Sequence, residues 1–406
     1  MRRVSDTVFL YSIESRELMK SPADDALPVV PLRPHKGRGA ITNIAGRYEV
    51  DERQPVDDGW LHVAADCDGD VIAPLKTRVF NERAKRILTR NASPDIPFSV
   101  SLNPYRGCEH GCIYCFARPT HSYLGLSPGL DFESRIYAKV NAPELLHAEL
   151  AKPSYVPEPI ALGVNTDAYQ PVERDLRITR RVLDVLDRHR HAVAAITKSS
   201  LIERDIDLLA PMAHRGQALV AITVTTLDAD VARTLEPRAA TPSRRLRTIR
   251  TLADAGIPVG VSIAPVIPFI TEPDLERVLD ACSQAGASSA SYIVLRLPWE
   301  VAPLFKQWLD AHFPGRAERV MNRIREMRGG NDYDASFGTR MKGQGAWAEL
   351  LKQRFERAAR KLGFTRRRHG TLDMSAFAPP AARTARRHVA RSAADSRGDA
   401  QMSLFD

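Results

Sequence analysis

The sequence has few cysteines and no long apolar run. Of its 406 residues only five are cysteine, and two of these, Cys67 and Cys282, stand alone. No apolar stretch approaches the roughly 18 residues that a membrane helix needs, so we expect no membrane span. Residues 1–6 are not followed by the apolar core of a signal peptide, and we therefore expect a cytoplasmic protein. A composition of 44% hydrophobic and 26% charged residues is ordinary for a globular protein.

The remaining three cysteines form a cluster with the spacing C-x3-C-x2-C: Cys108, Cys112 and Cys115. Cytosolic thiols at close, regular spacing are usually metal ligands or redox groups, and three thiols leave an odd one after any disulfide. Gly107 and Gly111 permit positive φ, so the spacing indicates a wrapped loop in place of an unbroken helix. Such a loop can direct three thiolates at one centre.

Three cysteines leave two interpretations of that centre open. A structural zinc site needs a fourth ligand, which His110 or His121 could supply. A [4Fe–4S] cluster held by three cysteines instead keeps one iron free for a small molecule.

The rest of the chain alternates between strand and helix patterns. The pattern at 98–102 predicts a strand that leads into the cysteine loop, and five more strands are predicted at 159–166, 192–197, 219–226, 258–265 and 291–297. Helices are predicted between and after them at 143–152, 172–188, 203–213, 228–235, 243–255, 272–285 and 301–312. We expect Asp228 and Thr271 to cap helix starts, and Gly256 and Gly286 to follow helix ends. This alternation predicts an α/β fold with a parallel sheet, either open or closed into a barrel.

The cysteine spacing, with Tyr114 directly before the third cysteine, resembles the signature of the radical S-adenosylmethionine (SAM) superfamily. The resemblance implies a partial (β/α)6 TIM-type barrel and a [4Fe–4S] cluster held by the three cysteines, whose open iron is chelated by SAM. It also implies that the reduced cluster cleaves SAM to a 5′-deoxyadenosyl radical, which abstracts hydrogen from the substrate. An electron donor such as flavodoxin or ferredoxin would be a partner.

In such a barrel the site lies at the carboxyl ends of the strands, where this sequence carries polar residues. We expect Lys198 to pair with the carboxylate of SAM. Asn165, Thr166 and Asp167 are candidates to bind the ammonium or ribose, and Thr223 and Thr225 to bind the ribose or carboxylate. Tyr114 is a further candidate cofactor-binding residue. Glu236 and Arg238 are expected to form a structural ion pair.

Three short blocks resemble the branch of this superfamily that includes spore photoproduct lyase, an enzyme that repairs thymine dimers in DNA. They are Thr166-Asp167, Thr197-Lys198-Ser199 and Glu236-Pro237-Arg238, within a layout that spans residues 97–300. The lyase has a cysteine just before the first block, which returns hydrogen to the product radical. This sequence has none at 162–165, so the resemblance does not extend to photoproduct lyase activity and is better matched by uncharacterised bacterial relatives.

The sequence divides into a core and extensions. We expect an irregular extension at 1–95, with a strand at 60–65 and a basic loop at 35–39 able to contact phosphate, then the barrel at 96–312. A basic helical segment follows at 313–377, and a disordered tail at 378–406. Residues 316–368 hold 15 Lys and Arg against 6 Asp and Glu, an excess equal to the formal charge of +9 of the whole chain. This concentration of charge favours DNA or RNA as a partner.

Within the basic segment an apolar stripe predicts a helix packed on the barrel: Trp347, Leu350, Leu351, Phe355, Ala358 and Leu362. The opposite face is a candidate phosphate-contacting surface: Lys352, Arg354, Arg357, Arg360, Lys361 and then Arg366, Arg367 and Arg368.

The residues from Gln401 to Phe405 read Gln-Met-Ser-Leu-Phe and resemble the peptide by which bacterial DNA polymerases and mismatch-repair proteins bind the sliding clamp. The first hypothesis is therefore a radical SAM enzyme that acts on DNA or another nucleic acid, in repair. The second keeps the same chemistry but places it on a peptide, tRNA or small molecule. The third is a non-catalytic, metal-bearing nucleic-acid-binding protein.

Overall fold

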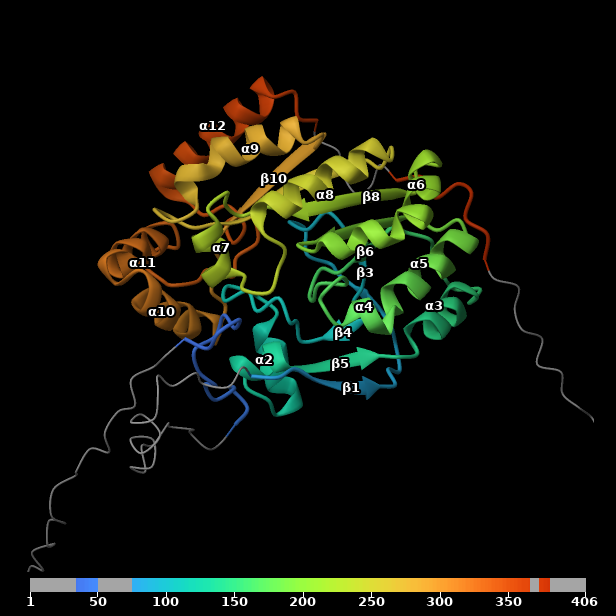
Figure 1. Ribbon diagram of the computed structural model, residues 1–406, viewed down its shortest axis with the longest axis horizontal. Coiled ribbons are helices and arrows are strands. Elements are labelled where there is room, and N and C mark those ends of the chain that lie inside the picture. Colours follow the sequence, from blue (N-terminus) through green and yellow to red (C-terminus); the bar gives the residue numbers. More distant parts are fainter. Residues whose placement is uncertain (1–33, 50–74, 366–371, 380–406) are drawn as a thin grey trace, which may run out of the picture.

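The computed structural model describes residues 34–49, 75–365 and 372–379, and its main feature is an open sheet of seven strands (Figure 1). The strand order is β10-β9-β8-β7-β6-β3-β2. From β3 to β10 every neighbouring pair is parallel, and β2 joins the edge antiparallel to β3. The strands are β2 (Leu88–Arg90), β3 (Val100–Leu102), β6 (Ile160–Leu162), β7 (Val193–Thr197), β8 (Ala218–Thr223), β9 (Val259–Val266) and β10 (Ser289–Val294).

Helices connect the parallel strands and cover the outer face of the sheet (Figure 1). They are α3 (Ala142–Leu150), α4 (Glu173–Leu176), α5 (Ile178–Arg188), α6 (Ile206–His214), α7 (Ala229–Leu235), α8 (Pro242–Asp254), α9 (Leu275–Gln284) and α10 (Val301–His312). Short 3-10 helices stand before two of them: η2 (Ser200–Asp205) before α6 and η3 (Glu272–Asp274) before α9. The six parallel strands confirm the predicted α/β architecture of partial (β/α)6 barrel type.

All six predicted strands are present; five are shorter than predicted, and β9 has the predicted length but begins and ends one residue later. The helix predicted at 172–188 is divided into α4 and α5 by Arg177, whose φ of 51° breaks the helical path. Asp228 caps α7 as predicted, since its carboxylate accepts hydrogen bonds from the N–H groups of Asp230 and Val231. The predicted cap at Thr271 is wrong, because its hydroxyl instead donates to the carbonyl of Pro265.

A second, smaller sheet lies beside the main one and was not predicted (Figure 1). Its strands are β1 (Arg78–Glu82), β5 (Arg135–Lys139) and β4 (Tyr105–Arg106), in the order β1-β5-β4. The helices η1 (Arg118–Leu124) and α2 (Leu130–Ser134) connect β4 to β5. The region before residue 96 is therefore not simply irregular, because it supplies β1 and β2. The strand predicted at 60–65 and Cys67 lie outside the described residues.

The basic segment after the barrel forms η4 (Pro314–Arg316), α11 (Ala317–Glu326) and α12 (Gly345–Lys361). Helix α12 lies along α9 (Figure 1), with Leu351 buried in the core as predicted. Leu350 is 52% exposed, so its place in the predicted stripe is wrong.

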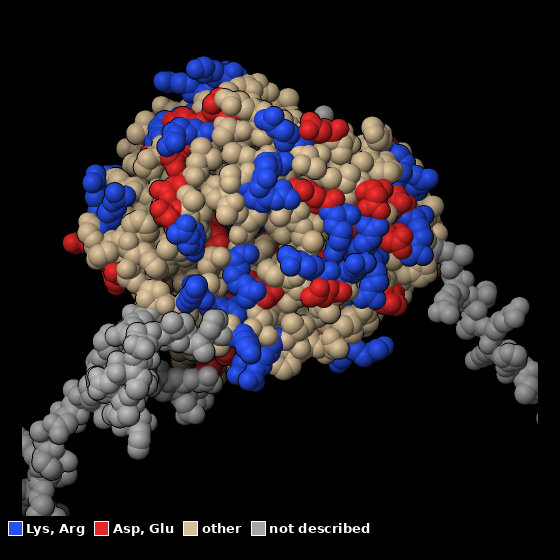
Figure 2. All heavy atoms as spheres, viewed as in Figure 1, with Lys and Arg blue, Asp and Glu red and all other residues tan. Residues whose placement is uncertain are grey.

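The predicted phosphate-contacting face of α12 is partly used inside the protein. Arg354 pairs with Glu276 at 2.8 Å and with Glu272. Figure 2 shows Lys and Arg side chains in small groups interspersed with Asp and Glu on the face drawn. Residues 366–368 and the clamp-like peptide lie outside the described residues. Among the residues that the structure describes, no helix is long and apolar enough to cross a membrane.

Candidate active site

The cysteine loop follows β4, and its backbone turns tightly at two glycines. Gly107 and Gly111 have φ values of 76° and 66°, as the sequence predicted. The N–H of Gly111 bonds to the carbonyl of Cys108 at 3.3 Å, and the N–H of Cys115 bonds to that of Cys112 at 3.2 Å. These turns place three free thiols in one region, with Cys108 and Cys112 buried and Cys115 half-buried.

The three thiols act on one another electrostatically. Burial raises the pKa of the Cys108 thiol well above its ordinary value, and Asp167, Cys112 and Cys115 raise it further. Burial also raises the pKa of Cys112 to about 12, against the opposing effect of the nearby Lys198 ammonium. Burial therefore disfavours the thiolate at both positions, and a bound cation would be needed to stabilise it.

The fully buried guanidinium of Arg118 holds the loop in shape. It donates five hydrogen bonds, which match the five N–H groups of an arginine. Four go to backbone carbonyls at 2.9 to 3.1 Å, and the fifth goes to the Glu133 carboxylate. The four carbonyls belong to Gly111, Cys112, Pro128 and Gly129. Sequence reasoning did not find this arginine, although it stands three residues after the last cysteine.

The Glu133 carboxylate also connects the N-terminal segment at 34–49 to the cysteine loop. The N–H groups of Gly39 and Ala40 donate to Glu133 at 3.0 and 2.8 Å. A Cβ atom at Gly39 would lie 1.9 Å from the carbonyl oxygen of Gly111, so only glycine fits there. Arg38 is 6% exposed and donates to the Glu133 carbonyl, so the predicted role of this residue in contacting phosphate is wrong.

Asp167 lies after β6, and its carboxylate is engaged by four protein donors. It accepts hydrogen bonds from the Thr197 hydroxyl at 2.7 Å and from the N–H groups of Tyr169 and Lys198, each at 2.8 Å. His110 Nδ1 lies 3.2 Å from Oδ2 of Asp167, the oxygen that also accepts from the N–H of Lys198. Asp167 therefore joins the cysteine loop to the ends of β6 and β7.

Tyr114 and Lys198 both lie near the buried ion pair of Glu236 and Arg245. The Tyr114 hydroxyl donates to Glu236, whose other oxygen accepts from Arg245. The ammonium of Lys198 lies 5.9 Å from the centroid of the Tyr114 ring. Burial lowers the pKa of Lys198, but the negative charges of the Glu236 carboxylate and of Cys112 in its thiolate form outweigh that effect and raise it overall. The lysine at the end of β7 is therefore a cation beside the cysteine loop.

The expected ion pair between Glu236 and Arg238 is not formed. Glu236 pairs with Arg245 on α8, and Arg238 pairs with Glu109 at 3.1 Å. Arg245, in the first turn of α8, therefore reaches the Glu236 side chain, whereas Arg238, which is nearer in the sequence, contacts a different carboxylate.

The remaining predicted residues differ in what their side chains contact. The hydroxyl of Thr225 is buried and has no hydrogen-bond partner in the described part of the chain, so it is free to bind a ligand. Thr223 is buried at the end of β8. Thr166 uses its hydroxyl on the carbonyl of Tyr105, and Asn165 is exposed with its backbone held by Asn103.

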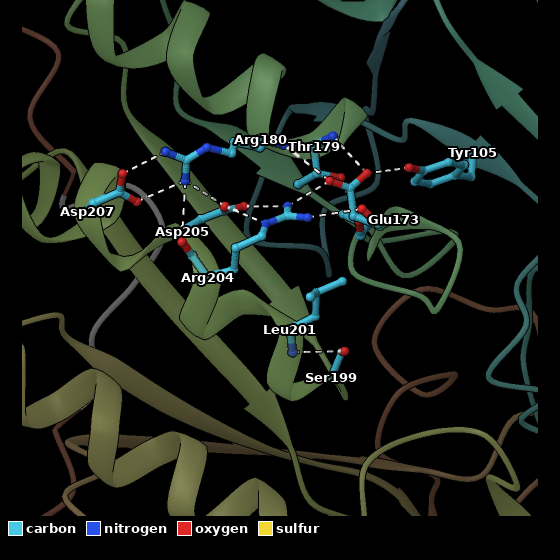
Figure 3. A network of polar contacts seen from close by, with 10 residues as sticks. Tyr105, Glu173, Thr179, Arg180, Ser199, Leu201, Arg204, Asp205 and Asp207 are labelled. Atoms are coloured by element: carbon cyan, nitrogen blue, oxygen red, sulfur yellow. Dashed lines mark hydrogen bonds and ion pairs between the residues drawn. The ribbon is translucent and has the colours of Figure 1, made fainter. Parts of the chain in front are cut away.

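A polar network outside this set fixes the segment after β6 (Figure 3). Glu173 is fully buried and accepts from the Tyr105 hydroxyl, from the N–H of Thr179 at 3.0 Å and from Arg204 at 2.8 Å. Arg204 also contacts Asp205, which binds Arg180 at 2.9 Å. A cavity of about 350 Å³ lies next to this network. Its lining includes His110, Arg174, Ser199, Arg204 and Arg238.

The contacts of the two histidines bear on the zinc interpretation. His110 is paired with Asp167, and His121 Nε2 shares a hydrogen bond with the carbonyl of Arg135 at 3.0 Å. Among the described residues, no group of three or more His, Cys, Asp or Glu side chains could hold a single metal ion. A cluster binds each cysteine at a different iron, so it does not require the thiols to converge on one point. Three free cysteines alone are the donor set of a cluster with one open iron, whereas a structural zinc site needs a fourth ligand.

A partial α/β barrel with a three-cysteine loop at the carboxyl ends of its strands defines a class of iron–sulfur enzyme. The family model of the radical SAM superfamily matches residues 102–282. An uncharacterised protein of Mycobacterium tuberculosis is 35% identical over 234 residues, which cover 57% of this chain and 68% of that protein. An uncharacterised protein of Methanocaldococcus jannaschii is 25% identical over 248 residues, which cover 61% and 88%.

Solved structures show the same fold. Spore photoproduct lyase in complex with dinucleoside spore photoproduct aligns with a TM-score of 0.51 at 14% identity, over 70% of this chain and 80% of that one. The chain belongs to the radical SAM superfamily, whose members are enzymes that use a [4Fe–4S] cluster and SAM.

Proposed function

We propose that Cys108, Cys112 and Cys115 hold the [4Fe–4S] cluster. We also propose that the enzyme acts on a nucleic acid in a repair reaction. The observation that carries the first part is the grouping of three free cysteines in one short loop, which Arg118 shapes. When bound, the cluster and SAM supply reductive cleavage of SAM and a 5′-deoxyadenosyl radical for hydrogen abstraction from the substrate.

The chain's own residues would bind and orient SAM beside the loop. Lys198 is the cation placed to pair with a carboxylate, and Asp167 positions it by accepting its backbone N–H. Glu236 fixes the Tyr114 ring against the lysine. The unpartnered hydroxyl of Thr225 would donate to the ribose or carboxylate.

A nucleic-acid substrate is supported by two observations. The formal charge of +9 favours a polyanionic partner. A solved structure with the same fold is a lyase bound to a dinucleoside photoproduct. Since residues 162–165 contain no cysteine, hydrogen must return to the product by a route other than the one in that lyase.

Anaerobic reconstitution with iron and sulfide tests the cluster. We expect about four irons per chain, and 5′-deoxyadenosine on reduction with SAM. Cys115→Ala should lose both, whereas Cys282→Ala, which changes a buried thiol on α9, should keep both. Stoichiometric zinc without SAM cleavage would contradict the proposal.

Titration of labelled single-stranded and duplex DNA, and of RNA, at low and high salt tests the substrate class. Binding that weakens with salt is expected for contacts to phosphates. If no nucleic acid binds even at low salt, while SAM cleavage persists, the substrate is a peptide or a small molecule.

A further inference from the structure

An aromatic ring and an arginine lie together beside the third cysteine. Phe116 directly follows Cys115 and is 45% exposed, which is unusual for a phenyl ring. The guanidinium carbon of Arg296 lies 5.6 Å from the centroid of this ring. Arg296 stands two residues after β10, so it lies at the carboxyl edge of the main sheet, where the other candidate site residues also lie.

A loop at 328–344 completes this group from the other side. Tyr333 accepts a hydrogen bond from Arg296 at 3.2 Å, and its ring centroid lies 5.9 Å from the same guanidinium. We name Phe116, Arg296 and Tyr333 the aromatic–arginine platform. The loop also carries Phe337, which is 58% exposed and lies 4.6 Å from the guanidinium carbon of Arg340.

Hydrogen bonds hold the loop at 328–344 at several points, so the platform is pre-organised before a substrate binds. The N–H of Val294 donates to the carbonyl of Met341 at 2.9 Å. Buried Arg328 donates to the carbonyls of Leu295 and Thr339, each at 2.8 Å. Arg340 binds both oxygens of Asp95, which precedes β3, so the loop is attached near both edges of the open sheet.

We propose that the aromatic–arginine platform stacks an unpaired nucleobase of the substrate strand beside the cysteine loop. This inference rests on the proposed nucleic-acid substrate. Exposed aromatic rings and guanidinium planes are the groups on which single-stranded bases stack. The buried Nε–H of Arg296 has no acceptor among the described residues, and the edge of a base or a phosphate would supply one.

An unpaired base suits the platform better than a duplex does. A base inside a duplex has both faces covered, and enzymes that perform chemistry on a base act on a single strand or extrude that base.

Fluorescence of a single-stranded oligonucleotide with one 2-aminopurine tests the stacking in the full-length holoenzyme. We expect binding to quench the probe, and Phe116→Ala to weaken binding by about 5-fold or more. Arg296→Lys keeps the charge but removes the planar group, so it should also reduce the quenching. The control Tyr123→Ala removes a 66% exposed ring on η1 and should change neither value.

Each other outcome overturns the inference in a distinct way. If Phe116→Ala raises the KM for SAM and leaves oligonucleotide binding unchanged, the ring contacts the adenine of SAM. If both platform variants bind the oligonucleotide with wild-type affinity and quenching, the nucleic acid binds elsewhere. If the wild-type enzyme binds no nucleic acid at low salt, the proposed substrate class itself fails.

Discussion

The substitution Arg118→Lys should loosen the cysteine loop without removing any cysteine. The guanidinium makes five hydrogen bonds in a fully buried site, four of them to backbone carbonyls. A lysine has three donors, so at least two of these bonds are lost. Buried hydrogen bonds to a charged group contribute about 1.5 to 3 kcal/mol each, which gives a loss of about 3 to 6 kcal/mol.

The melting temperature and the iron content measure this effect. For a chain of 406 residues, an unfolding entropy of about 2.1 cal/mol/K per residue converts that loss into a decrease of about 4 to 7 °C. We also expect less iron per chain after anaerobic reconstitution, because the carbonyls of Gly111 and Cys112 lose their donors. The control Arg135→Lys changes a half-exposed arginine paired with Asp131 at 3.3 Å and should have little effect. Wild-type melting and full iron content in Arg118→Lys would refute this reasoning.

Further predictions concern SAM, pH and the clamp. Lys198→Met should raise the KM for SAM about tenfold or more in a 5′-deoxyadenosine assay, whereas Lys152→Met, an exposed change on another surface, should not. Burial lowers the pKa of His191 to about 4, so the folded state keeps it neutral while the unfolded chain takes up a proton below about pH 6.5. The free energy of unfolding, measured by urea denaturation, should then fall by about 3 kcal/mol as the pH drops from about 6.5 to about 4. A smaller fall in His191→Gln would assign this pH dependence to His191. Finally, Leu404→Ala with Phe405→Ala should abolish binding to an immobilised bacterial sliding clamp, and unchanged binding would exclude the peptide as the contact.

The parallel core could be predicted from the sequence because its strands obey a simple physical rule. Strands covered on both faces must be apolar nearly throughout, and β6, with the residues Ile160–Leu162, is fully buried. The small sheet has no comparable pattern. The strand β1 is mostly exposed, and β4 has only two residues, so neither has the alternation or length that indicates a strand.

Some site residues could not be predicted because their partners are distant in the sequence. A buried arginine such as Arg118 is rare, and a single sequence gives no sign that five acceptors surround it. For Glu236, the sequence offers several nearby arginines, among them Arg233, Arg238 and Arg244, and only the folded chain selects Arg245. The three cysteines were different, since residue type and spacing alone indicate a metal or redox site.

The contacts of Asp167 and Lys198, both expected from the sequence to bind SAM, differ in the structure. Asp167 and Lys198 both stand at strand ends, but all the contacts of the Asp167 carboxylate are with four donors of the protein itself. The Lys198 ammonium, in contrast, has the Tyr114 ring as its described neighbour and is attracted by Cys112 and Glu236. The Lys198 ammonium forms no ion pair with a carboxylate among the described residues and can pair with that of a ligand, whereas the oxygens of Asp167 are already occupied by donors. We therefore propose that Lys198 contacts SAM and that Asp167 positions this lysine by accepting its backbone N–H.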